Sequence, residues 1–214
     1  MTIILAGASG LIGQAVAKKL EGPDLQLITR RKLDTQAAQI IAQPEDWHSY
    51  IGAAKPSIAI SALGTTIRQA GSQAAFRAVD YDLVVSVARA AKEAGAKQFI
   101  MVSSVGASAK ARNFYLTTKG EAEDAVRAMG FDRVDVLRPG LLRGDRQGPT
   151  RPVESLMIAL SPVTDFLVPA VLSQYRSIAG HEVAAAIASL TKATTPGIFI
   201  HHNIEMLALA KCMG

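Results

Sequence analysis

An apolar run at residues 2–6 leads directly into a turn that carries three glycines, and residues 11–20 then continue with helical spacing. The turn reads Gly7-Ala8-Ser9-Gly10-Leu11-Ile12-Gly13. Gly7 permits a tight turn, Gly10 lets the backbone approach a bound group, and Gly13 lets the helix pack closely on the strand. This feature therefore predicts that the chain opens with a β-α unit of a parallel sheet.

The rest of the chain repeats this alternation of short apolar runs with longer stretches of helical periodicity. The runs expected to be strands are 2–6, 25–29, 57–61, 98–103 and 133–137, with a weaker one at 39–42 and a late one at 197–201. The stretches expected to be helices are 11–20, 73–94, 115–129 and 181–192. Such alternation predicts the α/β class, with a doubly wound parallel sheet of the Rossmann type.

The length of 214 residues fits a single domain. The rhythm changes after Gly140, because residues 143–164 contain Pro149, Pro152 and Pro162 and are expected to form a loop with a short helix. We expect residues 1–214 to form one domain, in which 141–214 contribute a small cap on the substrate side.

Composition narrows the classes of partner. Lys and Arg exceed Asp and Glu to give a net charge of +5, but the basic residues are scattered, which argues against nucleic-acid binding. Cys212 is the single cysteine, so neither an internal disulfide nor a cysteine-based metal cluster is expected. Without a recognisable leader or a long apolar run, a cytoplasmic protein without a membrane span is expected. The oligomeric state is open between a monomer and a homodimer.

The glycine turn in this context favours a dinucleotide, because the helix N-terminus offers free N–H groups and partial positive charge to phosphates. Residues 7–12 are the expected phosphate loop. Arg30 and Arg31 follow the second strand, where a carboxylate usually selects NAD(H) and arginine accommodates a 2′-phosphate. We therefore expect NADP(H) to be preferred over NAD(H). The alternatives are that both arginines are solvated loop residues, or that Asp34 acts as the carboxylate.

Small residues also follow the next inner strand. Ala62, Leu63 and Gly64 stand at the carboxyl end of the expected strand 57–61, where backbone can line a cofactor cleft. A plain turn is the alternative at this position.

A polar constellation follows the expected strand 98–103. Ser104 comes directly after it, and Tyr115 and Lys119 stand four residues apart, on one face of the next helix. A phenol exchanges protons poorly at neutral pH unless a nearby ammonium stabilises its anion. We predict that Tyr115 is the acid/base, that Lys119 tunes it and binds the cofactor ribose, and that Ser104 orients the substrate oxygen. Two surface residues would be the alternative for an isolated Tyr–Lys pair.

With these residues in place, the chain resembles short-chain dehydrogenases/reductases of the extended and atypical kind, and within them the Tat-interacting-protein-like oxidoreductases. The matching stretches are 7–13, 63–66, 102–107, 113–121 and 131–146, so the likeness is good over residues 1–150 and loose beyond. The resemblance implies that Ser104, Tyr115 and Lys119 form the catalytic set. It also implies that Pro139 lies near the nicotinamide and that Leu63 and Gly64 lie along the cofactor.

The chain departs from this resemblance in two places. Many relatives carry an asparagine in the helix after the fourth strand, whereas this chain has Val79-Asp80-Tyr81-Asp82 there. The C-terminal part is also shorter than in sugar-nucleotide epimerases, which leaves little room for a bulky nucleotide-sugar. His201 and His202 are expected to be solvated, and Trp47 is expected to be a packing residue.

Three functions are open at this point. The favoured one is an NADP(H)-dependent oxidoreductase that acts on a small carbonyl or alcohol. The second is an NADP(H)-binding regulatory or interaction protein with little turnover. The third is a flavin reductase, in which the Ser–Tyr–Lys set would be incidental.

Overall fold

The computed structural model describes residues 1–143 and 175–212. Its centre is a seven-stranded sheet in the order β3-β2-β1-β4-β5-β6-β9, and every neighbouring pair is parallel. The strands are β1 (Ile3–Ala6), β2 (Leu25–Thr29), β3 (Ala38–Ile41), β4 (Ile58–Ser61), β5 (Gln98–Val102), β6 (Arg133–Leu137) and β9 (Gly197–His201). The expected doubly wound Rossmann-like sheet is confirmed.

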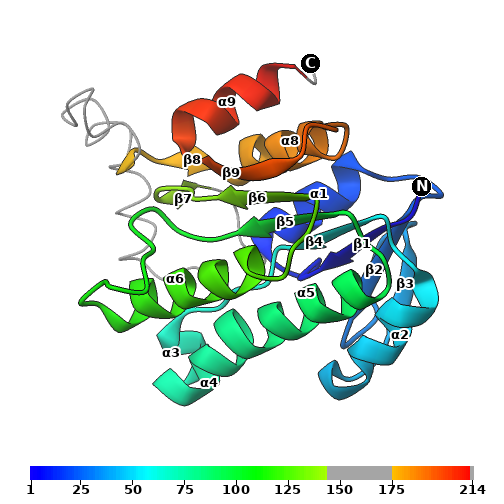
Figure 1. Ribbon diagram of the computed structural model, residues 1–214, viewed down its shortest axis with the longest axis horizontal. Coiled ribbons are helices and arrows are strands. Elements are labelled where there is room, and N and C mark those ends of the chain that lie inside the picture. Colours follow the sequence, from blue (N-terminus) through cyan, green and yellow to red (C-terminus); the bar gives the residue numbers. More distant parts are fainter. Residues whose placement is uncertain (144–174, 213–214) are drawn as a thin grey trace.

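Helices cover both faces of this sheet (Figure 1). On one face lie α1 (Leu11–Lys19), α8 (Gly180–Leu190) and α9 (Asn203–Lys211). On the other lie α2 (Trp47–Ala54), α4 (Gln73–Arg77), α5 (Val84–Glu93) and α6 (Phe114–Arg127), with the short α3 (Ile67–Ala70) beside α4. The sheet is therefore the middle of three layers.

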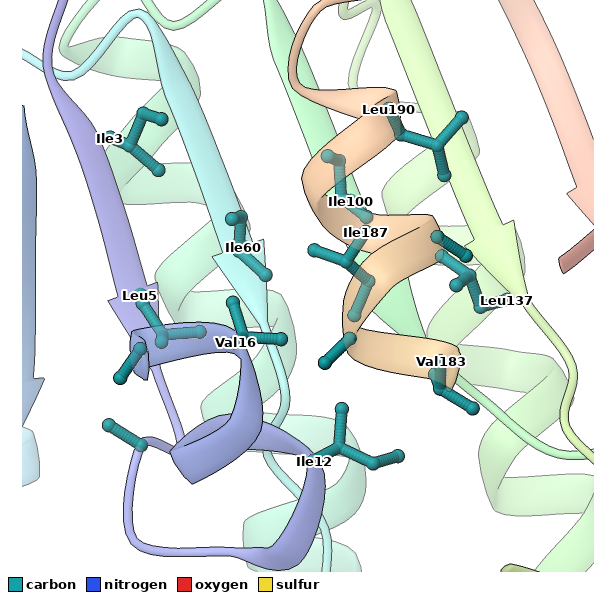
Figure 2. Packing of buried hydrophobic residues seen from close by; sticks show 14 of the residues in the cluster. Ile3, Leu5, Ile12, Val16, Ile60, Ile100, Leu137, Val183, Ile187 and Leu190 are labelled. Atoms are coloured by element: carbon teal, nitrogen blue, oxygen red, sulfur yellow. The ribbon is translucent and has the colours of Figure 1, made fainter. Parts of the chain in front are cut away.

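The core consists of two apolar clusters, one on each face of the sheet. Figure 2 shows the first, in which strand residues such as Leu5, Ile60 and Ile100 meet Val16 of α1 and Ile187 of α8. The second cluster packs the opposite strand residues against α2, α5 and α6. Burying one such side chain fully contributes about 1.5–3 kcal/mol, so these layers hold the strand ends in fixed positions.

The expected helix at 73–94 contains a feature that periodicity does not reveal. It begins at Gln73, after Ser72 accepts a hydrogen bond from the Ala75 amide, and it runs as α4 and α5 with a π-helical turn, Ala78–Leu83, between them. A π turn widens the helix by one residue and changes which side chains face a neighbour. This turn packs against α6.

The C-terminal segment contributes to the main fold. β9 pairs with β6 at the edge of the sheet, and α8 packs on α1 and α9. A short parallel pair, β7 (Leu142–Arg143) with β8 (Ile178–Ala179), joins the two ends of the part that lies outside the described residues. The loop and short helix expected at 143–164 fall in that part, except for Arg143, which ends β7. The substrate-side role of 141–214 stays a prediction.

The strand order predicts a ligand-binding crevice at the carboxyl ends of β1 and β4. The chain leaves β1 toward β2 on one side, whereas β4 continues toward β5 on the other, and ligands of open α/β sheets bind where the order reverses in this way. Ala6 and Ser61 are partners in the register, and the Ala62 amide donates to the Ala6 carbonyl at 2.9 Å. The glycine turn and the loop after β4 are therefore neighbours.

Candidate functional site

The turn between β1 and α1 has no room for side chains at two of its glycines. Gly7 has φ +88°, and a Cβ there would lie 2.5 Å from the Ala62 backbone. A Cβ on Gly13 would lie 2.1 Å from the Gly7 carbonyl oxygen. Gly10 is the N-cap residue of α1, and its amide donates to the Gly7 carbonyl at 3.1 Å. The sequence therefore folds here into a tight, backbone-lined loop.

The remaining residues of this loop divide between core and surface. Ser9 and Gly10 are exposed at the N-terminus of α1, where backbone amides can meet an anion. Ala8 and Ile12 are buried in the apolar cluster, and Leu11 lies against Gly180 of α8. Ala8, Leu11 and Ile12 thus offer a ligand their backbone, while their side chains anchor the loop.

The loop after β4 forms the second wall of the crevice. Leu63 is buried and Gly64 is exposed. A Cβ on Gly64 would lie 3.5 Å from Asp80 Oδ1 and 3.6 Å from Lys119 Nζ, so the backbone of Gly64 passes directly beside both charged groups. The Thr65 amide donates to Asp80 Oδ2 at 2.9 Å.

Helix α6 brings Lys119 to this wall. The helix begins after Asn113, whose side chain accepts a hydrogen bond from the Leu116 amide. Lys119 lies on its buried face and pairs with Asp80, with 2.8 Å between Nζ and Oδ1. The side chains are 6% and 0% exposed, so this is a buried ion pair of the site.

Tyr115 and Ser104 are the other two members of the predicted set. Tyr115, one turn earlier on α6, is half-buried, and its ring packs on Phe76 of α4 at 5.4 Å between centroids. Ser104 follows β5, and its hydroxyl reaches only the Val105 carbonyl, at 3.4 Å. Within residues 1–143 and 175–212, no hydrogen bond joins any two of the Ser104, Tyr115 and Lys119 side chains.

The ends of β5 and β6 are fastened together beside this set. Pro139 is buried, and its carbonyl accepts a hydrogen bond from the Val105 amide at 3.0 Å.

Sequence reasoning missed Glu123, which lies one turn beyond Lys119 and is fully buried. It accepts hydrogen bonds from the Ser103 hydroxyl at 2.5 Å and from Arg138 Nε at 3.0 Å. The four-residue spacing from Lys119 was the available signal for a carboxylate on the buried face of α6.

Asp80 is the second residue whose role the sequence did not reveal. Its position was noticed because acids replace an expected asparagine, but the contacts with Lys119 and Thr65 depend on the π turn.

Arg30 and Arg31 lie where the sequence placed them, directly after β2 and on the same edge of the sheet as the glycine turn. Both are exposed. The Thr29 hydroxyl donates to the Arg31 carbonyl at 3.0 Å, which fixes the backbone of the turn. Neither guanidinium has an ion-pair partner among the described residues, so both are available to a phosphate.

Two minor expectations can be checked. Trp47 is a packing residue as expected: it is buried, and its indole N–H donates to the Ala42 carbonyl at 3.0 Å. The expectation that His201 is solvated is wrong, because it is buried and its Nε2 donates to Asp135 Oδ1 at 2.9 Å. The reason is that β9 is a strand of the main sheet, which sets His201 beside β6. Across the described residues there is neither a cluster of metal-ligating side chains nor a helix long and apolar enough to cross a membrane.

These residues suit a dinucleotide. The glycine turn excludes side chains where a pyrophosphate would approach, the exposed α1 N-terminus supplies amides, and Gly64 leaves open the path past Lys119. An arrangement of this kind can bind phosphates at one end and exchange a proton at the other.

Solved structures of similar fold include nucleotide-dependent enzymes. MoeE5 in complex with UDP-glucose and NAD superposes with a TM-score of 0.71 at 15% identity, covering 99% of this chain and 82% of that one. UDP-glucose 4-epimerase from Thermotoga maritima with UDP-glucose superposes with a TM-score of 0.70 at 16% identity, covering 100% of this chain and 81% of that one. At this identity the likeness establishes the fold alone.

Curated relatives are closer in sequence. "Protein FMP52, mitochondrial" from Meyerozyma guilliermondii is 33% identical over 223 residues, which covers 99% of this chain and 96% of the relative. "Protein FMP52-1, mitochondrial" from Scheffersomyces stipitis is 30% identical over 227 residues, which covers 99% of both chains. The cytoplasmic location expected from the sequence is contradicted by this comparison, because the relatives' names place those proteins in mitochondria.

The family match agrees with the geometry of the crevice. The matched region, residues 7–192, begins at the first glycine of the turn and includes the loop after β4 and helix α6. The chain belongs to the NAD(P)H-binding family, together with the FMP52 proteins.

Proposed function

We propose that the protein is an NADP(H)-dependent oxidoreductase of the short-chain dehydrogenase/reductase type that acts on a small carbonyl or alcohol. The observation that carries this proposal is the position of the Lys119 amine, buried on α6 and beside Gly64, at the crevice that begins with the glycine turn. A lysine and a tyrosine one turn apart at a dinucleotide crevice provide a proton-exchanging pair where hydride chemistry needs one. The resemblance to the Tat-interacting-protein-like group supports the same assignment.

Each residue has a distinct task in this proposal. The bound dinucleotide supplies or accepts the hydride. In the reduction direction, the Tyr115 hydroxyl gives its proton to the substrate oxygen, and the Lys119 ammonium stabilises the phenolate that is left. Ser104 donates a hydrogen bond to the same oxygen as negative charge develops on it. Pro139 accepts a hydrogen bond from the amide of Val105, the residue after Ser104, and so shapes the wall of the site next to Ser104.

The preference for NADP(H) rests on Arg30 and Arg31. Two exposed arginines after β2 offer planar, permanently charged donors at the place where the adenosine ribose of a dinucleotide lies in such folds. A 2′-phosphate there would gain charge-assisted hydrogen bonds that NAD(H) cannot form.

Two measurements on one protein test the proposal. Thermal unfolding is followed with NADPH, NADP, NADH and NAD, and a ligand at 100 times its dissociation constant should add about 2.7 kcal/mol of stability. NADPH oxidation is then followed against a panel of small aldehydes and ketones. We expect larger shifts with the phosphorylated dinucleotides and a turnover that is lost in Tyr115→Phe. Full turnover in that variant would exclude the mechanism.

The second candidate is an NADP(H)-binding regulatory protein with little turnover. It is favoured by the ion pair that engages the Lys119 ammonium with Asp80, and by the lack of hydrogen bonds among Ser104, Tyr115 and Lys119 in the described part of the chain. This candidate predicts thermal stabilisation by NADPH together with no oxidation across the whole carbonyl panel. Any NADPH oxidation that depends on Tyr115 decides for the enzyme.

A further inference from the structure

A buried carboxylate, Asp80, lies next to the candidate catalytic lysine, Lys119. Asp80 belongs to a different helical segment, which carries none of the candidate catalytic residues. The Asp80 side chain is completely buried, and it lies within the π-helical turn that separates α4 from α5. An isolated charge in such a position is strongly destabilising unless it is paired and hydrogen-bonded. Its partners should therefore account for its presence.

The partners of Asp80 come from two different parts of the site. Oδ1 lies 2.8 Å from Lys119 Nζ on α6, and Oδ2 accepts the Thr65 amide from the loop after β4 at 2.9 Å. One carboxylate thus bridges the helix with the candidate catalytic residues and the loop that forms the cofactor wall. Gly64, between these groups, is close enough that a Cβ would contact both.

The π turn gives this carboxylate its direction. A π turn inserts one residue into the helical repeat, and such turns occur frequently at functional sites. The turn from Ala78 to Leu83 packs against α6, so the displaced side chain of Asp80 faces Lys119.

Nearby charges within the described residues are engaged elsewhere. Arg77 pairs with Glu121 and stacks on the Tyr81 ring at 4.2 Å. Glu123 pairs with Arg127 and Arg138. Asp82, also on the π turn, is exposed. Asp80 is thus the carboxylate that is placed to hold the Lys119 ammonium.

We propose that Asp80 is a positioning residue, which fixes the Lys119 ammonium and the Thr65 amide at one point and so couples the cofactor wall to the catalytic helix. This inference rests on the proposed oxidoreductase function. With Asp80 in place, the ammonium stands beside Gly64, where a dinucleotide would pass, and in register with Tyr115 one turn away. Without the carboxylate charge, the lysine chain is free to turn away from that point.

The test compares Asp80→Asn with the wild type and with Asp82→Asn, a control from the same turn. An asparagine oxygen can still accept the Thr65 amide, so Asp80→Asn removes the ion pair selectively. We expect Asp80→Asn to lower kcat by about 10²-fold, as for other losses of catalytic alignment, with little change in KM for the carbonyl substrate. NADPH affinity, measured by thermal shift or titration without turnover, should weaken by about tenfold. Asp82→Asn should match the wild type in all three.

A second background shows whether Asp80 acts through Lys119. In Lys119→Gln, the further change Asp80→Asn should alter neither kcat nor NADPH affinity by more than about twofold, because the group to be positioned is already absent. It should also recover thermal stability, because the buried carboxylate no longer lacks its counter-charge. The double variant has neither charge of the ion pair, so the comparison remains possible if Asp80→Asn alone folds poorly.

The outcomes separate the inference from the function beneath it. A folded Asp80→Asn protein with wild-type kcat and NADPH affinity would overturn the positioning role only. The same would follow if Asp80→Asn lowered kcat equally in the wild-type and Lys119→Gln backgrounds. A wild-type protein that binds neither NADPH nor NADH would overturn the proposed function, and this inference with it.

Discussion

The Glu123 carboxylate and the Arg138 guanidinium form an ion pair that joins the middle of α6 to the residue directly after β6, with 2.5 Å between Oε2 and Nη2. Glu123 is fully buried and also accepts the Ser103 hydroxyl from the end of β5. Lys119 and Tyr115 precede Glu123 by one and two turns of the same helix. The Glu123–Arg138 ion pair therefore fixes the position of both side chains relative to the strand ends. Helix α6 is thus fixed to the sheet by a charge contact as well as by apolar packing.

Glu123→Gln should therefore destabilise the fold. The change keeps an acceptor for Ser103 but leaves Arg138 and Arg127 without their shared buried partner, and breaking a buried pair costs about 3–5 kcal/mol. For a chain of this size each kcal/mol lowers Tm by about 2–4 °C. Thermal unfolding followed by circular dichroism measures the loss. Asp124→Asn, at an exposed neighbour, serves as control, and equal Tm values for the two variants would contradict the anchoring role.

Tyr115→Phe should remove proton exchange and leave cofactor binding intact. The phenyl ring can keep its contact with Phe76, so the fold and the thermal shift with NADPH should be unchanged. Loss of a general acid typically lowers the rate by about 10²–10⁴-fold. Steady-state NADPH oxidation measures the effect, with Tyr50→Phe at an exposed position of α2 as the matched control. A drop in NADPH binding equal to the drop in rate would show that the Tyr115 hydroxyl only supports cofactor binding.

Arg30→Ala combined with Arg31→Ala should abolish discrimination between the two dinucleotide classes. Both side chains are exposed, so the change should leave the Tm of the free protein nearly unaltered. The thermal shift with NADPH should then fall to the level seen with NADH, which has no 2′-phosphate for these arginines to bind. The Lys18→Ala variant controls for a general loss of positive charge on the neighbouring helix α1. If the shift with NADPH persists in the double variant, the selectivity must come from elsewhere.

The features that could be predicted from the sequence are those that depend on residues close together in the chain. Strands such as Leu25–Thr29 and Arg133–Leu137 were placed at their observed bounds, because each is a short stretch rich in apolar and branched residues. The glycine turn could likewise be predicted, because a side chain at Gly7 or Gly13 would clash with the nearby backbone. These features depend on neighbours in the chain.

Asp80 and Glu123 were not foreseen as members of the site because their roles depend on packing between distant segments. One partner of Asp80 lies 15 residues before it and the other lies on α6, beyond α5 and β5, and a π turn that periodicity does not predict decides its direction. His201 was expected to be solvated for the same reason, since only the pairing of β9 with β6 places it beside Asp135. The role of a buried charged residue can be predicted from a sequence only when its partner in the fold is known.

Gly13→Ala should be a strongly damaging substitution in the chain's first turn. The Cβ of an alanine would lie 2.1 Å from the Gly7 carbonyl oxygen, so α1 would have to move off β1 and the glycine turn would move with it. We expect a lower Tm and loss of the thermal shift with NADPH. Gly52→Ala is the control, because its Cβ on α2 meets nothing within 4 Å and alanine favours helix by about 0.5–1 kcal/mol. Tolerance of alanine at Gly13 would mean that the turn is looser than described.

The buried Asp135 should make stability depend on pH at the acid end. Burial alone would raise the pKa of Asp135, but hydrogen bonds from His201, Arg133 and Gln98 outweigh it and hold that pKa below its usual value. A carboxyl whose folded pKa is depressed binds fewer protons in the native state, so its contribution is complete above the unfolded value of about 4. That contribution is lost as the pH falls through the folded pKa.

Urea unfolding at a series of pH values between about 6 and 3 measures this dependence, because the free energy of unfolding should fall across the range in which the unfolded carboxyl takes up its proton. Asp135→Asn cannot titrate, so its curve should start lower at pH 6 and fall less steeply toward pH 3. Asp132→Asn, at an exposed position just before β6, should keep the wild-type slope. A wild-type slope in Asp135→Asn would contradict the role of Asp135 in the acid sensitivity.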